Sequence, residues 1–265
     1  MPHVGKLEGI PDYKFRQSPF FPLVPKAPFR QAIVAGSNGG KTNLLITQVT
    51  KYFRNVFDRI VLVTPSHGLD DTLKPLYKLM EELGQDVAED CMDHFDSDWL
   101  QEKLDEQRKI VEYQKAHKQG TTMTRPLMQL LGILDDISDS APTIRSAGSG
   151  TGALSTLMCR ARHFGTSCIM SLQKLYTAPP LLRCNFSDII LLKIKVRREL
   201  DSALETVSAL LPDKASVEQF YRKAVEKEYG FIWFALARED NDTVHIGFSP
   251  GLKIAETSKM RMIYN

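Results

Sequence analysis

We predict from the sequence an α/β fold in which helices flank a mostly parallel central sheet. Short apolar, β-branched runs alternate with longer segments whose apolar residues recur at helical spacing. The first such run leads through a glycine-rich loop into the first helical segment. Runs that are apolar on both faces are typical of parallel strands that helices cover on both sides.

Bulk composition sets few limits on function. The chain has 265 residues, of which 43% are hydrophobic and 25% charged, as is ordinary for a soluble globular protein. A net charge of +2 is small for a dedicated nucleic-acid binder, so any such contact must come from a local patch. The four cysteines lack CxxC spacing, which argues against a zinc site or a disulfide framework. No apolar run approaches the ~18 residues of a membrane span, so we expect a soluble protein with no membrane partner.

The expected elements follow one another along a single domain, residues 30–265. Residues 1–29 are rich in proline and are expected to form an extended arm, docked on this domain or on a neighbouring copy. The segment 97–118 is typical of an amphipathic surface helix, and residues 229–237 and 243–249 predict a C-terminal β-hairpin. We expect the other strands at 31–36, 58–65, 130–136, 166–173 and 187–196, and the other helices at 42–53, 70–83, 152–164 and 197–211.

The glycine-rich loop fits the phosphate-binding pattern [Ala or Gly]-x-x-x-x-Gly-Lys-[Ser or Thr], with Ala35 at its first position. A strand enters the loop and a helix leaves it, so backbone amides point at the phosphates. Lys41 is expected to reach the β- and γ-phosphates of ATP, and the Thr42 hydroxyl to ligate Mg²⁺. A glycine-rich turn that binds nothing is the alternative. The expected nucleotide-binding residues are Gly36, Ser37, Asn38, Gly39, Gly40, Lys41, Thr42 and Asn43.

Two acids end the apolar run at 130–136. A phosphate site needs a second magnesium anchor at the end of a neighbouring strand, and Asp135 can supply it directly or through water. Asp136 is expected to polarise the attacking water as general base. The alternative, an acid pair that only caps the following loop, is disfavoured by the phosphate-binding loop in the same chain.

Polar residues lie at both ends of the expected strand at 166–173. The carboxyl ends of parallel strands form the ligand edge of an open sheet, so we expect Gln173 to face the γ-phosphate and to orient water or sense hydrolysis. Arg162 precedes the strand, away from its own nucleotide, where it can reach a neighbour's γ-phosphate as an arginine finger in a ring. Arg183 is a second candidate for the finger, and a surface ion pair is the alternative for Arg162.

In this order the motifs resemble the genome-packaging ATPases of poxviruses, other large DNA viruses and related virus-like transposable elements, in the FtsK-HerA division of P-loop NTPases. The resemblance spans roughly residues 28–195. Ala35 departs from the usual first glycine, and Asp136 stands where many relatives have Glu, so turnover is expected to be slower. The most specific element comprises Arg162, His163, Gln173, Pro179, Pro180, Arg183 and Asn185.

The resemblance implies a RecA-like (ASCE) ATPase that uses ATP and Mg²⁺ to pump double-stranded DNA into a viral capsid. It implies Asp135 and Asp136 as the Walker B pair, Gln173 as the sensor and Arg162 as the finger. Its implied partners are further copies in a ring and a capsid or portal vertex, in the cytoplasm, a virus factory or the virion. The alternatives are a cellular HerA-like or conjugation-type translocase, a P-loop metabolite kinase, and a nucleotide-binding scaffold without turnover.

A translocase must also hold the DNA backbone with basic residues, and this part of the pattern is the least specific. If residues 187–196 continue as a strand, Lys193, Lys195 and Arg197 alternate onto one face. The further candidates are Arg145 in a glycine- and serine-rich loop, and Lys103, Arg108 and Lys109 on the helix at 97–118.

Overall fold

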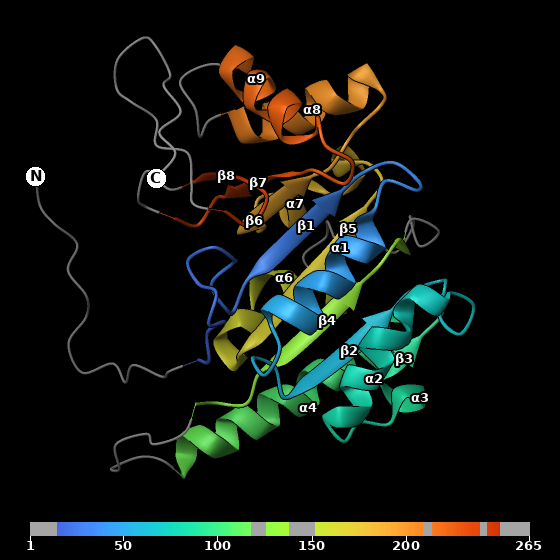
Figure 1. Ribbon diagram of the computed structural model, residues 1–265. Coiled ribbons are helices and arrows are strands. Elements are labelled where there is room, and N and C mark those ends of the chain that lie inside the picture. The colour runs from blue at the N-terminus through green and yellow to red at the C-terminus, as the bar shows by residue number, and fades with distance from the viewer. Residues whose placement is uncertain (1–14, 118–125, 138–151, 209–213, 239–242, 250–265) are drawn as a thin grey trace, which may run out of the picture.

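The computed structural model describes residues 15–117, 126–137, 152–208, 214–238 and 243–249. The strands of these residues are β1 (Arg30–Val34), β2 (Arg59–Val63), β3 (Cys91–Met92), β4 (Leu130–Leu134), β5 (Thr166–Leu172), β6 (Asp188–Leu191), β7 (Ile232–Ala235) and β8 (Val244–Ile246). They form one sheet in the order β3-β2-β4-β5-β1-β6-β7-β8 (Figure 1). Strands β1 to β6 pair in parallel, whereas β7 runs antiparallel to β6 and β8. The predicted α/β fold with a mostly parallel sheet is confirmed.

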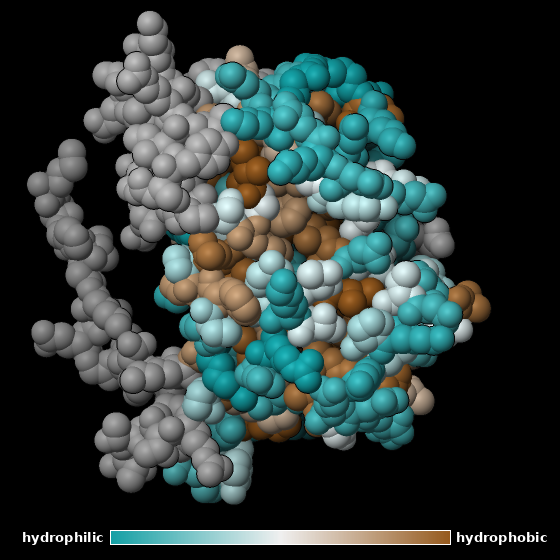
Figure 2. Space-filling view, viewed as in Figure 1, coloured by the Kyte–Doolittle hydropathy of each residue, from teal (hydrophilic) through white to brown (hydrophobic). Residues whose placement is uncertain are grey.

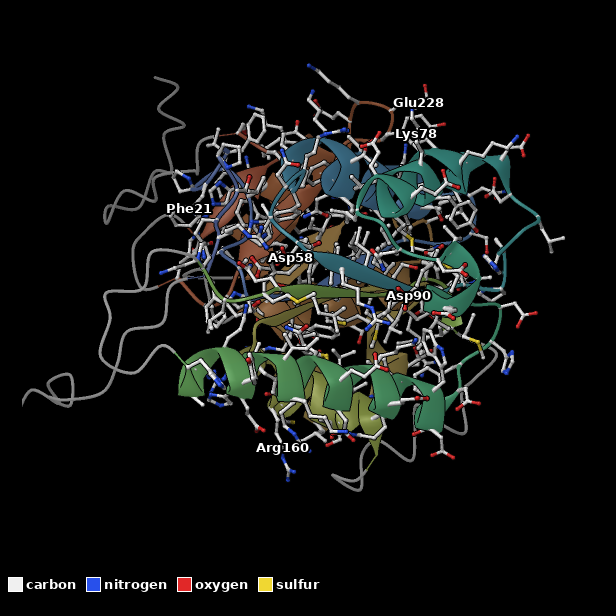
Figure 3. All side chains as sticks on the ribbon, turned by 90° about the horizontal axis from the view of Figure 1, so that it is seen from below. Phe21, Asp58, Lys78, Asp90, Arg160 and Glu228 are labelled. Carbon is white, nitrogen blue, oxygen red and sulfur yellow. The ribbon has the colours of Figure 1, made fainter. Side chains whose placement is uncertain are left out.

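Helices cover both faces of this sheet. They are α1 (Lys41–Thr47), the π-helix η1 (Gln48–Tyr52), the 3-10 helix η2 (Asp71–Leu73), α2 (Lys74–Glu82), α3 (Val87–Asp90), α4 (Ser97–Ala116), α6 (Ala153–Cys159), the 3-10 helices η5 (Ala161–Phe164) and η6 (Leu175–Thr177), α7 (Pro180–Arg183), α8 (Arg197–Val207) and α9 (Lys214–Ala224). The apolar residues of α1, η1 and α2 share one core with Ile33 of β1. Those of α4, α6, α8 and α9 share the other core with Ala32 and Val34, because successive strand residues face opposite sides. Figure 3 shows the two layers edge-on, with α4 opposite α1 and α2.

The predicted surface helix is α4. Its stripe of Leu100, Leu104 and Val111 is fully buried against the sheet, and Gln107 extends the stripe as a buried polar residue. Hydrophilic residues gather over α8 and α9 at the top of the face drawn in Figure 2. Among the described residues, no helix combines the length and apolar character that crossing a membrane requires.

The strand expected at 187–196 is shorter than predicted, because β6 ends at Leu191. Beyond it, the Tyr221 hydroxyl of α9 donates to the Leu192 carbonyl (3.1 Å) and accepts from the Ile194 amide (2.7 Å). A side chain therefore satisfies the backbone groups that a neighbouring strand would otherwise satisfy. The chain leaves the sheet as a loop over 192–196.

The described part of the N-terminal arm, residues 15–29, packs on its own chain. The Ser18 hydroxyl donates to the Tyr52 carbonyl at 2.5 Å, and Val24 and Phe29 are fully buried in the core under α1. Phe20 and Phe21 are 39% and 41% exposed, so these two rings are only partly covered by the described residues.

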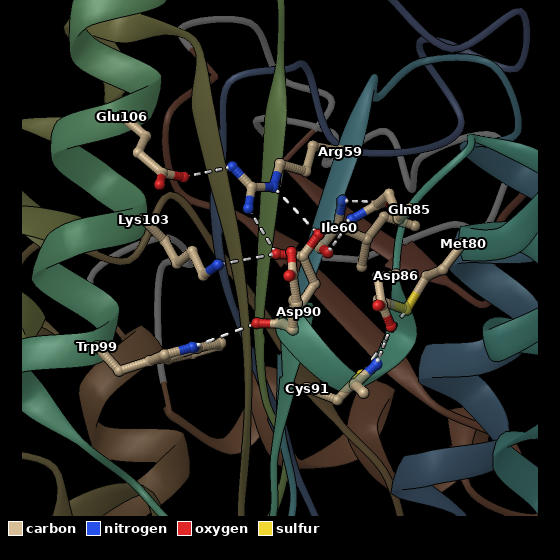
Figure 4. Close-up of polar contacts among 12 residues, drawn as sticks. Arg59, Ile60, Met80, Gln85, Asp86, Asp90, Cys91, Trp99, Lys103 and Glu106 are labelled. Carbon is tan, nitrogen blue, oxygen red and sulfur yellow. Dashed lines mark hydrogen bonds and ion pairs between the residues drawn. The ribbon is translucent and has the colours of Figure 1, made fainter.

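An ion-pair network fastens α3 and α4 to the outer strands of the sheet (Figure 4). Asp90, which is 4% exposed, accepts from Arg59 Nη2 (2.6 Å) and Gln85 Nε2 (2.6 Å), and Lys103 Nζ lies 3.3 Å from its Oδ1. Burial by itself raises the pKa of Asp90, but the hydrogen bonds from Arg59 and Gln85 and the nearby positive charges outweigh it and lower the pKa below its usual value.

Candidate nucleotide-binding site

The predicted phosphate-binding loop connects β1 to α1. Gly40 has a left-handed backbone (φ 86°) that places it at the N-terminus of α1, and Asn38 is also left-handed (φ 56°). The Lys41 side chain is held against the loop, where Nζ donates to the carbonyls of Ala35 (3.1 Å) and Gly36 (3.2 Å). The residues that face solvent are Gly36, Ser37, Asn38 and, on the first turn of α1, Asn43.

The loop and the first predicted acid meet at the carboxyl edge of the sheet. Thr42 Oγ1 donates to Oδ2 of Asp135 at 3.2 Å, although 93 residues separate them in the chain. Asp135 directly follows β4 and is 3% exposed. Thr64, which follows the neighbouring strand β2, donates to the same oxygen at 3.4 Å. The two residues predicted to anchor magnesium therefore lie side by side.

Asp136 and Gln173 are also brought together. Gln173 Nε2 lies 3.0 Å from each carboxylate oxygen of Asp136, so the amide donates to the acid predicted to act as general base. Asp136 has a left-handed backbone (φ 47°), which is uncommon for a residue other than glycine. Such a conformation persists only where its surroundings hold it, and it directs this carboxylate toward the end of β5.

Ser171 of β5 joins the two acids, and our sequence analysis missed it. Its hydroxyl donates to Oδ1 of Asp135 and accepts from the backbone amide of Asp136 at 2.9 Å. Thr64 was missed as well. One sequence signal could have found both residues: each is polar and lies near the carboxyl end of an apolar strand. Both strands pair with β4 in the parallel sheet, so their carboxyl ends lie beside Asp135.

The two candidate arginine fingers lie elsewhere. Arg162 is exposed in η5 and lines a cavity of about 660 Å³ with Arg30 at the start of β1, so it lies at the edge of the sheet opposite the phosphate-binding loop. Burial lowers the pKa of Arg30, and the positive charge of Arg162 lowers it further. Arg183 ends α7, two residues before Asn185, whose carbonyl accepts from Arg30 Nε at 2.7 Å.

The structure corrects two of the expectations about DNA-holding residues. Lys103 is 8% exposed and pairs with Asp90, so it cannot reach a DNA backbone. Lys193, Lys195 and Arg197 do not share a strand face, because β6 ends before them and Arg197 begins α8.

The other basic candidates differ in their surroundings. Arg197 forms a short ion pair with Glu218 (2.6 Å), whereas Lys193 and Lys195 are exposed beside the phosphate-binding loop. On α4, Arg108 lies 3.2 Å from Asp105, and Lys109 is exposed. Arg145 lies outside the described residues.

No protein-family model matches the sequence, and no curated protein matches it. The genome-packaging NTPase B204 of Sulfolobus turreted icosahedral virus 2, solved with AMP, has a TM-score of 0.52 at 16% identity over 84% of this chain and 97% of that chain. The DNA-packaging ATPase B204 of Sulfolobus turreted icosahedral virus has a TM-score of 0.50 at 16% identity over 84% of this chain and 98% of that chain. The chain therefore shares the fold of these two viral packaging proteins.

Proposed function

We propose that this protein is a magnesium-dependent ATPase that drives double-stranded DNA into a viral capsid as part of an oligomeric ring. The observation that carries the proposal is the convergence at one sheet edge of the loop lysine, two acids and a glutamine from three separate strand ends. The fold shared with viral packaging NTPases supports the choice of DNA as the substrate that is moved.

The residues present suit a magnesium ion. Thr42 and Asp135 offer a hydroxyl and a carboxylate oxygen 3.2 Å apart, and hard oxygen donors are what Mg²⁺ prefers. The described residues contain no group of three or more His, Cys, Asp or Glu placed to hold a metal, so the phosphates and water must complete the coordination. When bound, the ion would neutralise charge on the phosphates.

Each residue of the site then has a task in hydrolysis. Lys41 exchanges its two backbone carbonyls for the β- and γ-phosphates, since a cation prefers charged acceptors to neutral ones. Asp136 accepts a proton from the attacking water, and the amide of Gln173 orients the Asp136 carboxylate for this step. Ser171 fixes the positions of Asp135 and Asp136 relative to each other, because its hydroxyl donates to the Asp135 carboxylate and accepts from the Asp136 backbone amide.

The placement of Arg162 supports the proposed ring. Arg162 lies near the start of β1, whereas the phosphate-binding loop of the same chain follows the end of β1. This placement suits a residue that acts on the nucleotide of a neighbouring subunit. The cavity that it shares with Arg30 concentrates positive charge, as a site facing a γ-phosphate would. We infer that hydrolysis in one subunit changes this contact and moves the DNA-holding residues of the next, among which Lys193 and Lys195 are the exposed candidates.

The test measures the ATPase rate with and without double-stranded DNA over a series of salt concentrations. A DNA pump is stimulated by DNA, and the stimulation is lost at high salt because phosphate contacts depend on counterion release. Lys41→Ala serves as the control for contaminating ATPases. Hydrolysis that DNA does not change would favour a metabolite kinase, and absence of hydrolysis would favour a scaffold without turnover; either result would contradict the proposal.

A further inference from the structure

A cavity of about 530 Å³ adjoins the phosphate-binding loop, a size that is usual for sites of small ligands. One wall is the loop itself, Gly36 to Gly39, and Gln173 stands at the end of β5. The other wall is formed by residues 193–196 after β6 and by residues 226–229 after α9. In Figure 3 the segment that carries Glu228 lies on the same side of the sheet as α1. Since β1 lies between β5 and β6, the cavity extends to both sides of the loop.

Tyr229 stands out on the second wall. It is 61% exposed, yet its ring covers the loop so closely that a Cβ added to Gly40 would lie 2.7 Å from its Cδ1. Its backbone is left-handed (φ 57°), which is a true outlier for a bulky residue. An exposed aromatic ring in a strained conformation beside a ligand loop suggests a functional constraint rather than core packing.

The turn around Tyr229 fixes where the ring lies. The amide of Gly230 donates to the Lys227 carbonyl at 3.0 Å, and a Cβ on Gly230 would lie only 2.2 Å from the Ala224 carbonyl oxygen. Only glycine can therefore follow Tyr229, and the chain is anchored to the end of α9. These contacts fix the backbone from which the Tyr229 side chain projects toward Gly40.

We propose that Tyr229 stacks on the base of the bound nucleotide, so that this wall of the cavity holds the nucleoside. The inference rests on the proposed ATPase function and assigns the part of the site that the phosphate-binding loop leaves open. Phosphates held over the loop, with the γ-phosphate toward Gln173, direct the nucleoside away from β5 and toward the β6 side, where the ring lies. An exposed π face suits any of the bases, because stacking does not depend on base identity.

The experiment compares two probes by titration calorimetry in the presence of Mg²⁺, namely ATP and inorganic tripolyphosphate, which lacks a nucleoside. The variants are Tyr229→Ala, which removes the ring, and Tyr229→Phe, which keeps it. Tyr113→Ala is the matched control, because Tyr113 is 64% exposed and lies on α4, across the sheet from the loop. All three variants alter a solvent-exposed side chain, so the fold is expected to be retained.

Loss of the ring should weaken ATP binding roughly tenfold, within the range measured for base stacking, while tripolyphosphate affinity stays within about twofold. Tyr229→Phe and Tyr113→Ala should bind both probes as the unaltered protein does. Equal loss for both probes would show that Tyr229 only supports the loop, and unchanged or tighter ATP binding would exclude stacking; either result overturns the inference. If the unaltered protein bound neither probe, the proposed ATPase function would fail with it, and that outcome is distinct from the other two.

Discussion

Ser171→Ala offers a sharp test of the site, because one hydroxyl connects both acids. The substitution removes the donor to Oδ1 of Asp135 and the acceptor of the Asp136 amide, while the strand keeps its backbone bonds. Ser171 is 1% exposed, so water cannot readily replace the lost partner. Among the described residues, the Asp135 carboxylate then keeps hydrogen bonds from the hydroxyls of Thr42 and Thr64.

The magnitude follows from these two contacts. A hydrogen bond to a charged group contributes roughly 1.5–3 kcal/mol, and a buried donor left without a partner costs roughly 1–3 kcal/mol. Because the two bonds share one hydroxyl, we expect a loss of about 3 kcal/mol in the free energy of unfolding. For a chain of this size that corresponds to a melting temperature lower by roughly 6–12 °C. Without the hydrogen bond from its backbone amide to Ser171, Asp136 is also held less firmly. Its carboxylate is then less well placed for proton transfer, and we expect kcat to fall at least about tenfold.

Ser167→Ala is the matched control. Ser167 lies in the same strand, is fully buried and accepts from the Phe29 amide at 3.2 Å, but it lies at the amino end of β5. Chemical denaturation should show that both variants are destabilised, and ATPase assays well below both melting temperatures should show a reduced kcat for Ser171→Ala alone. Equal kcat values in the two variants would refute the proposed role of Ser171.

Three further predictions follow from the charged groups. Lys41→Ala and Asp136→Asn should each abolish ATP hydrolysis with little change in circular dichroism, because the first removes the phosphate-binding cation and the second the proton acceptor. Asp90→Asn should lower the free energy of unfolding by about 3 kcal/mol in urea titrations, near the lower limit for breaking a buried ion pair, because Arg59 retains Glu106 as a partner. Burial raises the pKa of Asp188 to about 6, so the folded state takes up this proton more readily than the unfolded chain does. The stability that protonation of Asp188 contributes is present at low pH and is lost as pH rises from about 4 to about 6. Asp188→Asn should remove this decline in the free energy of unfolding.

Each of these predictions has an outcome that would contradict it. Substantial hydrolysis by Lys41→Ala or Asp136→Asn would contradict the site assignment. Asp105→Asn removes a more exposed acid from the same region and should change stability by less than about 1 kcal/mol; an equal loss for Asp90→Asn would mean that burial of the pair is unimportant. Asn at position 188 can still accept from Trp233 Nε1 (2.9 Å in the native protein), so an unchanged pH dependence would exclude Asp188 as its source.

The sequence by itself determined the fold class, most of the strands and three polar residues at the carboxyl edge of the sheet. Strands and helices could be predicted because their apolar periodicity is local, and the loop motif is contiguous. Asp135, Asp136 and Gln173 could be assigned to one edge without coordinates, since parallel strands bring their carboxyl ends together. Each of these predictions required only residues within one segment and a general rule of sheet topology.

Tertiary structure alone decided the remaining features, because they depend on contacts between segments distant in the chain. Lys103 is three residues after Leu100, so helical periodicity places it on the buried stripe of α4, but only the tertiary structure brings Asp90 beside it as a charged partner. The end of β6 was set by the hydroxyl of Tyr221, a residue of a different helix. Ser171 is an unremarkable strand serine until β4 and β5 pair, and Tyr229 has no apparent role until the chain returns over Gly40. Such positions are selected by the shape of the folded chain, which local sequence pattern does not encode.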